Sequence, residues 1–69
     1  MKLAIYGTGG SGRELYEIIG MTREWNERWE EIVFIDDMKP EGEFLSRRML
    51  PFDSFCKLFP VSGIEVAIA

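Results

Sequence analysis

Three short apolar segments interrupt a chain that is otherwise rich in charged residues. They are Lys2–Tyr6 (KLAIY), Ile32–Ile35 (IVFI) and Glu65–Ala69 (EVAIA). Apolar residues follow one another in these segments more than they alternate with polar ones, a pattern typical of parallel strands with two buried faces. The pattern therefore predicts three strands, the first ending abruptly at Gly7 and the second at Asp36.

Helical periodicity lies between the predicted strands. The apolar positions that share a helical face are Leu15, Ile18 and Ile19 after the first strand, and Phe55, Leu58 and Phe59 before the third. We expect Asp53 or Ser54 to cap the second helix and Pro60 to end it. Cys56 falls on the apolar face of this helix, so we expect it in the core and not as a reactive thiol.

The segments on either side of the second strand have less regular patterns. Residues 21–31 are mostly charged but place Trp25 and Trp29 four residues apart, which favours a partly helical connection with packed tryptophans. Residues 38–48 are polar and include a proline and a glycine, so a loop is expected there. Residues 49–52 are predicted to form a short extended piece.

The order strand, helix, strand, helix, strand predicts an α/β fold with parallel pairing and right-handed crossovers. Residues 1–69 would then form one Rossmann-like, three-layer domain, the opening part of a doubly wound sheet. No helix follows the last strand, although a parallel sheet normally has both faces covered. We therefore expect the domain to be incomplete at its C-terminus, with the cover supplied by a larger protein or by partner chains. Its open sheet edge is expected to allow self-association.

Composition narrows the classes of function. Hydrophobic residues make up 46% and charged residues 29% of the chain, a balance typical of globular domains and not of disordered segments. No apolar run approaches the roughly 20 residues of a membrane span, and no signal-peptide core is present, so a cytoplasmic protein without a membrane partner is expected. With one cysteine and no histidine, neither a metal site nor histidine-based catalysis is expected. The net charge of −4 argues against nucleic acid as a partner.

The segment between the first strand and the first helix carries the strongest functional signal. Gly7, Gly9 and Gly12 match the G-x-G-x-x-G pattern, to which Gly10 adds a fourth glycine. The first allows the turn off the strand, the second lets the backbone approach an anion, and the third avoids a collision between helix and strand. Amides of the first helical turn, aided by the helix dipole, attract phosphate. The loop is predicted to face a ligand phosphate or another polar ligand group; the alternative is a tight turn in which Ser11 only caps the helix.

Two acidic residues follow the second strand directly. Asp36 and Asp37 lie where the Rossmann arrangement places a carboxylate that accepts hydrogen bonds from ribose hydroxyls. Adjacent side chains point in different directions, so one is expected to face the ligand and the other to cap the turn. The alternative is a solvated turn before Pro40. No nucleophile or partnered base accompanies the pair, so no catalytic residue is predicted. Arg13, in the first helical turn, is placed to reach a bound phosphate or to pair with Glu17.

The stretches LAIYGTGGSGRELYEII, VFIDD and LPFDSFCKLFPVSGIEVAIA resemble the N-terminal domain of the sugar O-acyltransferase, sialic acid O-acetyltransferase (NeuD/PglD-type) family. The resemblance covers essentially the whole chain and is sharpest at the glycine loop and at the Ile-Asp-Asp strand end. It implies a Rossmann-like domain that binds a UDP-type nucleotide sugar, the acceptor of an acetyl group. By motif position, Gly9, Gly10 and Ser11 would contact the nucleotide sugar. Asp36 and Asp37 would contact its uridine-type moiety.

The resemblance also indicates what lies outside this chain. In the family, a C-terminal left-handed β-helix of hexapeptide repeats holds acetyl-CoA, carries the catalytic histidine and forms trimers. The 69 residues are expected to stop before that β-helix, which implies an acceptor-binding module that is inactive alone and binds no cofactor itself. Acetyl-CoA would be the co-substrate of a homotrimeric parent protein. Two positions depart from the family: Ser11 stands where a histidine is common, and the chain ends at Ala69, where a ligand-contacting glycine usually follows.

Two other functions remain open on the sequence. The glycine motif with a distal aspartate also fits an NAD-binding half-domain of an oxidoreductase, although residues 21–31 make an unusually long, tryptophan-rich connection. The unfinished sheet edge fits a non-enzymatic assembly or regulatory module.

Overall fold

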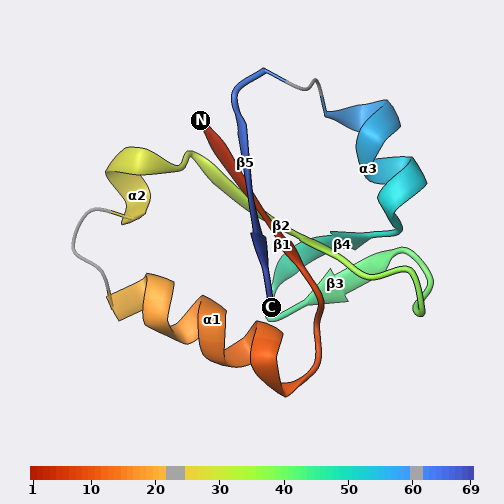
Figure 1. The fold of residues 1–69 in the computed structure, drawn as a ribbon, viewed down its shortest axis with the longest axis horizontal. Helices are drawn as coiled ribbons and strands as arrows, with labels where there is room; N and C mark the ends of the chain where they lie inside the picture. Colours follow the sequence, from red (N-terminus) through yellow and green to blue (C-terminus); the bar gives the residue numbers. More distant parts are fainter. Residues whose placement is uncertain (22–24, 60–61) are drawn as a thin grey trace.

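A mixed five-stranded sheet in the order β3-β4-β2-β1-β5 forms the centre of the domain (Figure 1). The computed structural model describes residues 1–21, 25–59 and 62–69. Along the chain the elements are β1 (Lys2–Tyr6), α1 (Gly10–Met21), α2 (Trp25–Arg28), β2 (Glu31–Ile35), β3 (Gly42–Phe44), β4 (Arg47–Leu50), α3 (Phe52–Leu58) and β5 (Ile64–Ile68). None of the described helices has the length and apolar character needed to cross a membrane.

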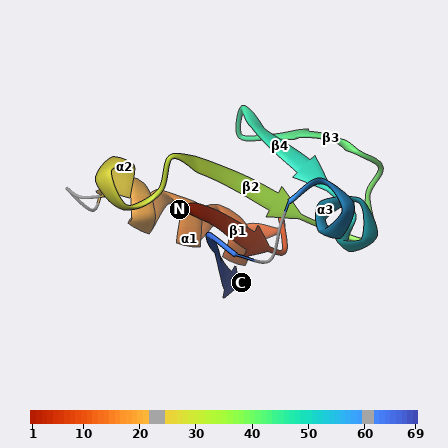
Figure 2. The same ribbon diagram turned by 90° about the horizontal axis from the view of Figure 1, so that it is seen from above.

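Four strands run in the same direction, and this parallel part of the sheet is the predicted Rossmann-like architecture. β1 pairs with both β2 and β5, and β2 pairs with β4. The chain passes from β1 to β2 by way of α1, then continues outward to β4 before it returns by way of α3 to β5 on the other side of β1. Figure 2 shows β5 and the β3–β4 hairpin at the two edges of the sheet. The direction in which strands are added therefore reverses between β1 and β5.

Each face of the sheet has its own apolar core, because successive strand side chains point to opposite faces. On the α1 face the buried residues are Leu3, Ile5, Ile19, Ile32, Phe34 and Met49. On the α3 face they are Ala4, Val33, Ile35, Leu50, Phe55 and Phe59. The two cores explain why the strands read as continuous apolar runs, and they confirm the three-layer prediction.

Three predicted core positions are wrong, and helix geometry gives the reason. Ile18 and Leu58 are more than half exposed, and Cys56 is exposed as well. The apolar line of α1 passes through Leu15 and Ile19, and that of α3 through Phe55 and its C-cap residue Phe59. A helix turns by about 100° per residue, so a residue three positions after Leu15 or Phe55 points about 60° away from that residue. Ile18 and Leu58 occupy these positions and therefore turn toward solvent. Cys56 follows Phe55 by one residue, so its side chain points about 100° away from that of Phe55.

The predicted loop over residues 38–48 is wrong in its second half, which forms an antiparallel hairpin of β3 and β4. Leu45 and Ser46 form its turn, and both have positive φ values, 51° and 63°. Two-residue hairpin turns of this kind usually carry Asn-Gly or a related pair, so the usual sequence signal is missing. Phe44 anchors the hairpin because its ring packs edge-on against buried Phe34 at a centroid distance of 4.9 Å. The predicted extended piece begins earlier than expected, as β4.

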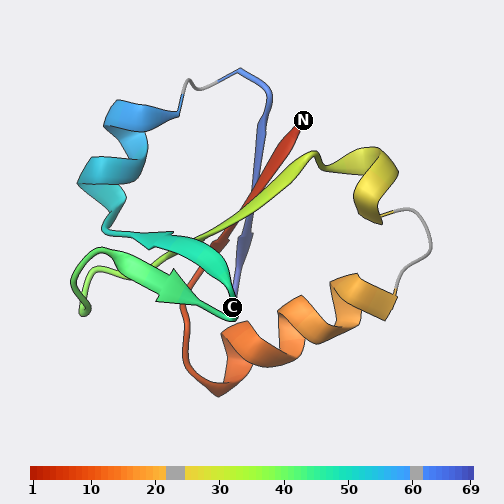
Figure 3. The same ribbon diagram turned by 180° about the vertical axis from the view of Figure 1, so that it is seen from behind.

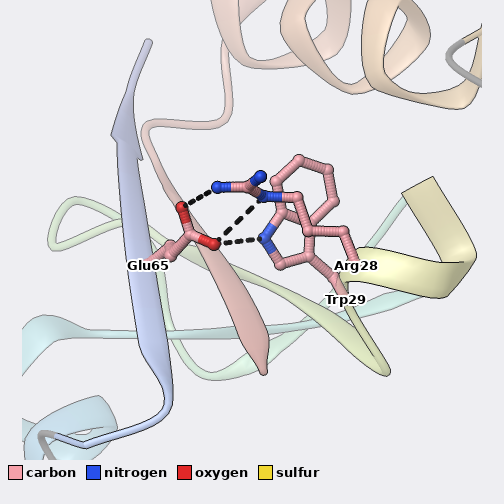
Figure 4. Close-up of polar contacts among 3 residues, drawn as sticks. All are labelled: Arg28, Trp29 and Glu65. Carbon is pink, nitrogen blue, oxygen red and sulfur yellow. Dashed lines mark hydrogen bonds and ion pairs between the residues drawn. The ribbon is translucent and has the colours of Figure 1, made fainter. Parts of the chain in front are cut away.

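A polar cluster links α2 to β5 (Figure 4). Arg28 Nε and a terminal guanidinium nitrogen of Arg28 donate to the two carboxylate oxygens of Glu65, at 3.2 and 2.9 Å. Trp29 Nε1 donates to the same carboxylate at 3.3 Å, and its half-buried ring packs on the α1-face core. The prediction that Trp29 packs is confirmed, whereas the side chain of Trp25 lies outside the described residues. This cluster fastens the edge strand to the rest of the domain.

Glu65→Gln is expected to lower the stability of the domain at pH 7, with the loss disappearing in acid. The hydrogen bond from Arg28 is the main cause that lowers the pKa of Glu65 in the folded protein. A carboxyl group with a lowered folded pKa stabilises above its unfolded pKa of about 4.3, and this contribution is lost as pH falls through the folded value. Urea unfolding of both proteins at pH 7 and pH 3 measures the difference. Glu30→Gln, at an exposed position, is the matched control; an equal loss in that variant would contradict the role of the cluster.

Candidate functional site

The carboxyl ends of β1 and β5 meet where the strand order reverses, the place at which open α/β sheets bind ligands. Gly7 leaves β1 with φ of 115°, a conformation that favours glycine. Its N–H donates to the carbonyl of Ile35 at 2.8 Å, and the N–H of Ala69 donates to the carbonyl of Tyr6 at 3.0 Å. These bonds fix the start of the glycine loop against both neighbouring strands.

Gly12 lies where α1 passes closest to the loop. A Cβ atom on Gly12 would lie 2.3 Å from the carbonyl oxygen of Gly7 and 3.0 Å from its carbonyl carbon. Both are backbone atoms, so neither can rotate aside. The prediction that this glycine prevents a collision between helix and strand is confirmed.

Gly9, Gly10 and Ser11 form the exposed rim of the loop at the start of α1. A Cβ atom on either glycine would meet no heavy atom within 4 Å, so space is open beside this backbone. The first N–H groups of a helix have no acceptor inside the helix, and those of α1 begin at this rim. The geometry leaves room for a group that accepts these bonds, and contact of the three residues with a ligand stays a prediction.

Asp36 ties the end of β2 to the glycine loop. The hydroxyl of Thr8, which is buried, donates to Asp36 Oδ2, and the N–H of Met38 donates to Oδ1 at 2.9 Å. Lys39 Nζ donates to the Thr8 hydroxyl at 2.8 Å and lies 3.9 Å from Asp36 Oδ2. The structure therefore brings the first predicted carboxylate to the loop, through a threonine that the sequence analysis did not single out.

Asp37 faces a different element. Its Oδ1 accepts the N–H of Phe52 at 2.8 Å, the first residue of α3, and its Oδ2 accepts the hydroxyl of Tyr6. The N-cap residue of α3 is Pro51, and no side-chain hydrogen bond comes from it. The prediction that Asp53 or Ser54 caps this helix is wrong, because the acceptor is Asp37, which follows the neighbouring strand β2. The aspartates do not divide as expected, because Asp36 both lies at the loop and caps the turn through the Met38 N–H, whereas Asp37 caps α3. Contact of either carboxylate with a ligand stays a prediction.

Both carboxylates are held in the ionised form. The hydrogen bond from Thr8 is the largest of the causes that lower the pKa of Asp36. The hydrogen bond from Tyr6 likewise lowers the pKa of Asp37, and the same bond raises the pKa of Tyr6. An ionised carboxylate offers about four acceptor positions, so each retains capacity for a further donor such as a ribose hydroxyl. At neutral pH the pair can accept hydrogen bonds from a ligand but cannot supply a proton.

Three side chains complete the surroundings of the loop, and the sequence signalled only one of them. Lys39 Nζ lies 5.4 Å and Arg13 Cζ 5.9 Å from the centre of the Phe44 ring. Arg13 was expected near a phosphate or near Glu17, and it lies against the hairpin. Lys39 lies in a segment that was predicted to be a polar loop, so its proximity to the glycine loop was not predicted. Its position three residues after Asp36 is the sequence signal that could have indicated this proximity.

A separate hollow lies further along α1. Its volume is about 130 Å³, and Tyr16, Glu17, Gly20 and Ile32 line it. Pockets for ligands of drug size usually measure about 300–1,000 Å³, so this hollow is too small for a nucleotide sugar. The loop at the carboxyl ends of the strands remains the candidate site.

The family comparison agrees with this architecture. The PglD N-terminal domain matches residues 2–68, nearly the whole chain. Searches of curated proteins and of solved structures found no match. The family match includes the glycine loop, both aspartates and the closing strand, and the fold is the Rossmann-like one that the sequence predicted. The chain therefore belongs to the PglD N-terminal domain family, the N-terminal domain of PglD- and NeuD-type acetyltransferases.

Proposed function

We propose that this domain binds the nucleotide-sugar acceptor of an acetyl-CoA-dependent sugar acetyltransferase, and that the ligand is of the UDP type. One observation carries the proposal: Thr8 joins the carboxylate of Asp36 to the glycine loop. An exposed row of helix-terminal amides and an ionised carboxylate thus lie at the same edge of the sheet, next to the reversal of strand order. Membership of the PglD N-terminal domain family supports the same reading.

The two parts of the site suit the two parts of such a ligand. Backbone amides of Gly9, Gly10 and Ser11 would donate to phosphate oxygens, helped by the dipole of α1. Asp36 and Asp37 would accept hydrogen bonds from the ribose hydroxyls or from the uracil N–H, because ionised carboxylates only accept. Ser11 supplies one hydroxyl beside the phosphates. The sugar would extend outward from the loop, where an acetyl donor can approach it.

The chemistry of the parent enzyme would occur outside these 69 residues. An amine or hydroxyl of the bound sugar would attack the thioester carbonyl of acetyl-CoA, forming a C–N or C–O bond as the C–S bond breaks. The proton of the attacking group would pass to a base and from the base to the sulfur, so that CoA would leave as the thiol. We place the base and the acetyl-CoA site in a separate part of a trimeric, cytoplasmic parent protein. This domain would contribute binding and orientation.

Titration of the ¹⁵N-labelled chain with a UDP-linked amino sugar should shift the amide signals of residues 9–11 and of Asp36 and Asp37. Ser11→Asp should weaken binding by roughly tenfold or more, because it places a like charge against the phosphates. An aspartate in the first turn of a helix is compatible with the helix dipole, so this variant should remain folded. The same titration compares the UDP-sugar with NADH.

Ser62→Asp is the matched control, since it adds the same charge at an exposed turn before β5 and should leave binding unchanged. If a folded wild-type chain showed no shift with millimolar UDP-sugar, or preferred NADH, the proposed function would be wrong.

A further inference from the structure

Two cations from separate segments converge on one aromatic ring beside the glycine loop. Lys39 comes from the turn after β2 and Arg13 from the start of α1, and both lie within 6 Å of the centre of the Phe44 ring, at 5.4 and 5.9 Å. The distance between Arg13 and the Phe44 ring places the β3–β4 hairpin next to the start of α1, and in the projection of Figure 3 the hairpin lies directly above the first turn of α1. The edge-on contact with buried Phe34 fixes the ring, so the ring is a rigid support for both cations.

Lys39 is held at the loop and still reaches solvent. Its ammonium group donates to the hydroxyl of Thr8 at 2.8 Å, while 45% of its side chain remains exposed. An ammonium group has three donors, and the bond to Thr8 uses one of them. The remaining donors are available to an anion that enters beside the loop.

The position of Arg13 is unfavourable for the helix alone. A cation in the first turn of a helix faces the positive end of the helix dipole, where an anion is preferred. The surroundings of the loop also include Asp36 and Asp37, and the whole chain has a net charge of −4. A phosphate ligand therefore needs local positive charge to enter, and Arg13 with Lys39 supplies two such charges on the loop side of the hairpin.

We propose that Arg13 and Lys39 together bind a diphosphate group, and that they select nucleoside diphosphate sugars over nucleosides and nucleoside monophosphates. This inference rests on the proposed function, because it concerns the same site. Two cations that approach from α1 and from the turn after β2 match the two charged phosphates of the ligand. Phe44 holds both side chains against one ring before the ligand arrives, which reduces the entropy cost of ordering them.

The test measures dissociation constants of UDP, UMP and uridine for the wild-type chain, for three variants of the two cations and for one control variant. Wild type should bind UDP at least about tenfold more tightly than UMP, since charge-assisted bonds to the second phosphate are strong. Lys39→Gln and Arg13→Gln should each reduce this preference several-fold, and the double variant should bind UDP and UMP almost equally. Circular dichroism melting confirms that each variant is folded. Lys57→Gln removes the same charge from an exposed position on α3 and should behave as wild type.

The outcomes separate this inference from the proposed function. If UDP shifts the amides of residues 9–11 and the double variant keeps the full preference for UDP, the diphosphate role is wrong and the proposed function stands. If the Lys57→Gln control loses the preference to the same degree, the effect is one of net charge and the inference is also wrong. If none of the three probes binds a folded wild-type chain, both proposals fail together.

Discussion

Gly12→Ala is expected to destabilise the domain more than any other single methyl addition at a described glycine. The new Cβ atom would lie 2.3 Å from the carbonyl oxygen of Gly7, so either α1 or the end of β1 must move. Gly7 cannot yield easily, because its N–H is bonded to Ile35 and its φ of 115° already requires glycine. We expect a loss of at least about 3 kcal/mol. A chain of 69 residues has a total stability of roughly 3–10 kcal/mol, so much of the population would unfold.

Gly20→Ala is the matched control for this substitution. Gly20 lies near the other end of α1, is exposed, and would place its new Cβ atom more than 4 Å from any heavy atom outside the local helix backbone. Alanine is favoured over glycine within a helix by up to about 1 kcal/mol, so this variant should be more stable than wild type. Urea unfolding, monitored by circular dichroism, measures the free energy of unfolding of wild type and of the two variants. A Gly12→Ala protein as stable as wild type would show that α1 can move away from β1 without cost.

The strands and the glycine loop could be predicted because their signals are local. Lys2–Tyr6 coincides with β1, and the second apolar run lies within β2. The backbone of a glycine motif also has few alternatives, which is why the roles of Gly7 and Gly12 followed from spacing alone. The strands and the glycine loop depend on residues that are close in the chain, where the hydrophobic pattern and the conformational propensities of the residues favour the same structure.

The hairpin and the helix cap could not be predicted because each depends on a distant partner. Leu45 and Ser46 adopt a left-handed turn that their own propensities disfavour, and the packing of Phe44 on Phe34 supplies the reason. The cap of α3 comes from Asp37, fifteen positions before Phe52 in the chain, so inspection of the residues next to the helix favoured the wrong acceptor. In both cases tertiary contact overrides local preference.

The same limitation applies to the candidate site. The position of the two aspartates at a strand end was visible in the sequence, but their partners were not. Thr8 occupies a variable position of the glycine motif, and only the folded sheet shows that its buried hydroxyl faces Asp36. The role proposed for Lys39 could be inferred only from the folded structure, in which the hairpin brings Phe44 close to its ammonium group. The structure therefore adds to the sequence a link between the glycine loop and Asp36, the parts of the site that we propose to bind phosphate and ribose.

Asp36→Ala is expected to test that link through the stability of the domain. The substitution leaves the buried Thr8 hydroxyl with Lys39 as its remaining described partner, and it removes the acceptor of the Met38 N–H. Hydrogen bonds to charged groups contribute about 1.5–3 kcal/mol each when they are protected from solvent, and this carboxylate is partly exposed. We therefore expect a loss of about 2–3 kcal/mol at pH 7, measured by urea unfolding. Asp53→Ala, at an exposed position in the first turn of α3, should lower the stability by less than about 1 kcal/mol, the size of the helix-dipole contribution that it removes.

The pH dependence of the same residue distinguishes its charge from its shape. Asp36→Asn keeps the size of the side chain and removes its charge. Because the hydrogen bond from Thr8 lowers the pKa of Asp36 in the folded protein, the ionised carboxylate stabilises the fold above its unfolded pKa of about 3.9. That contribution disappears as pH falls through the lower, folded value. The stability difference between wild type and Asp36→Asn should therefore be full at pH 6–7 and vanish well below pH 3.9. A difference that stayed constant down to pH 2 would mean that ionisation of Asp36 does not contribute to the stability of the fold, and a ribose-binding carboxylate at this position would lose its physical basis.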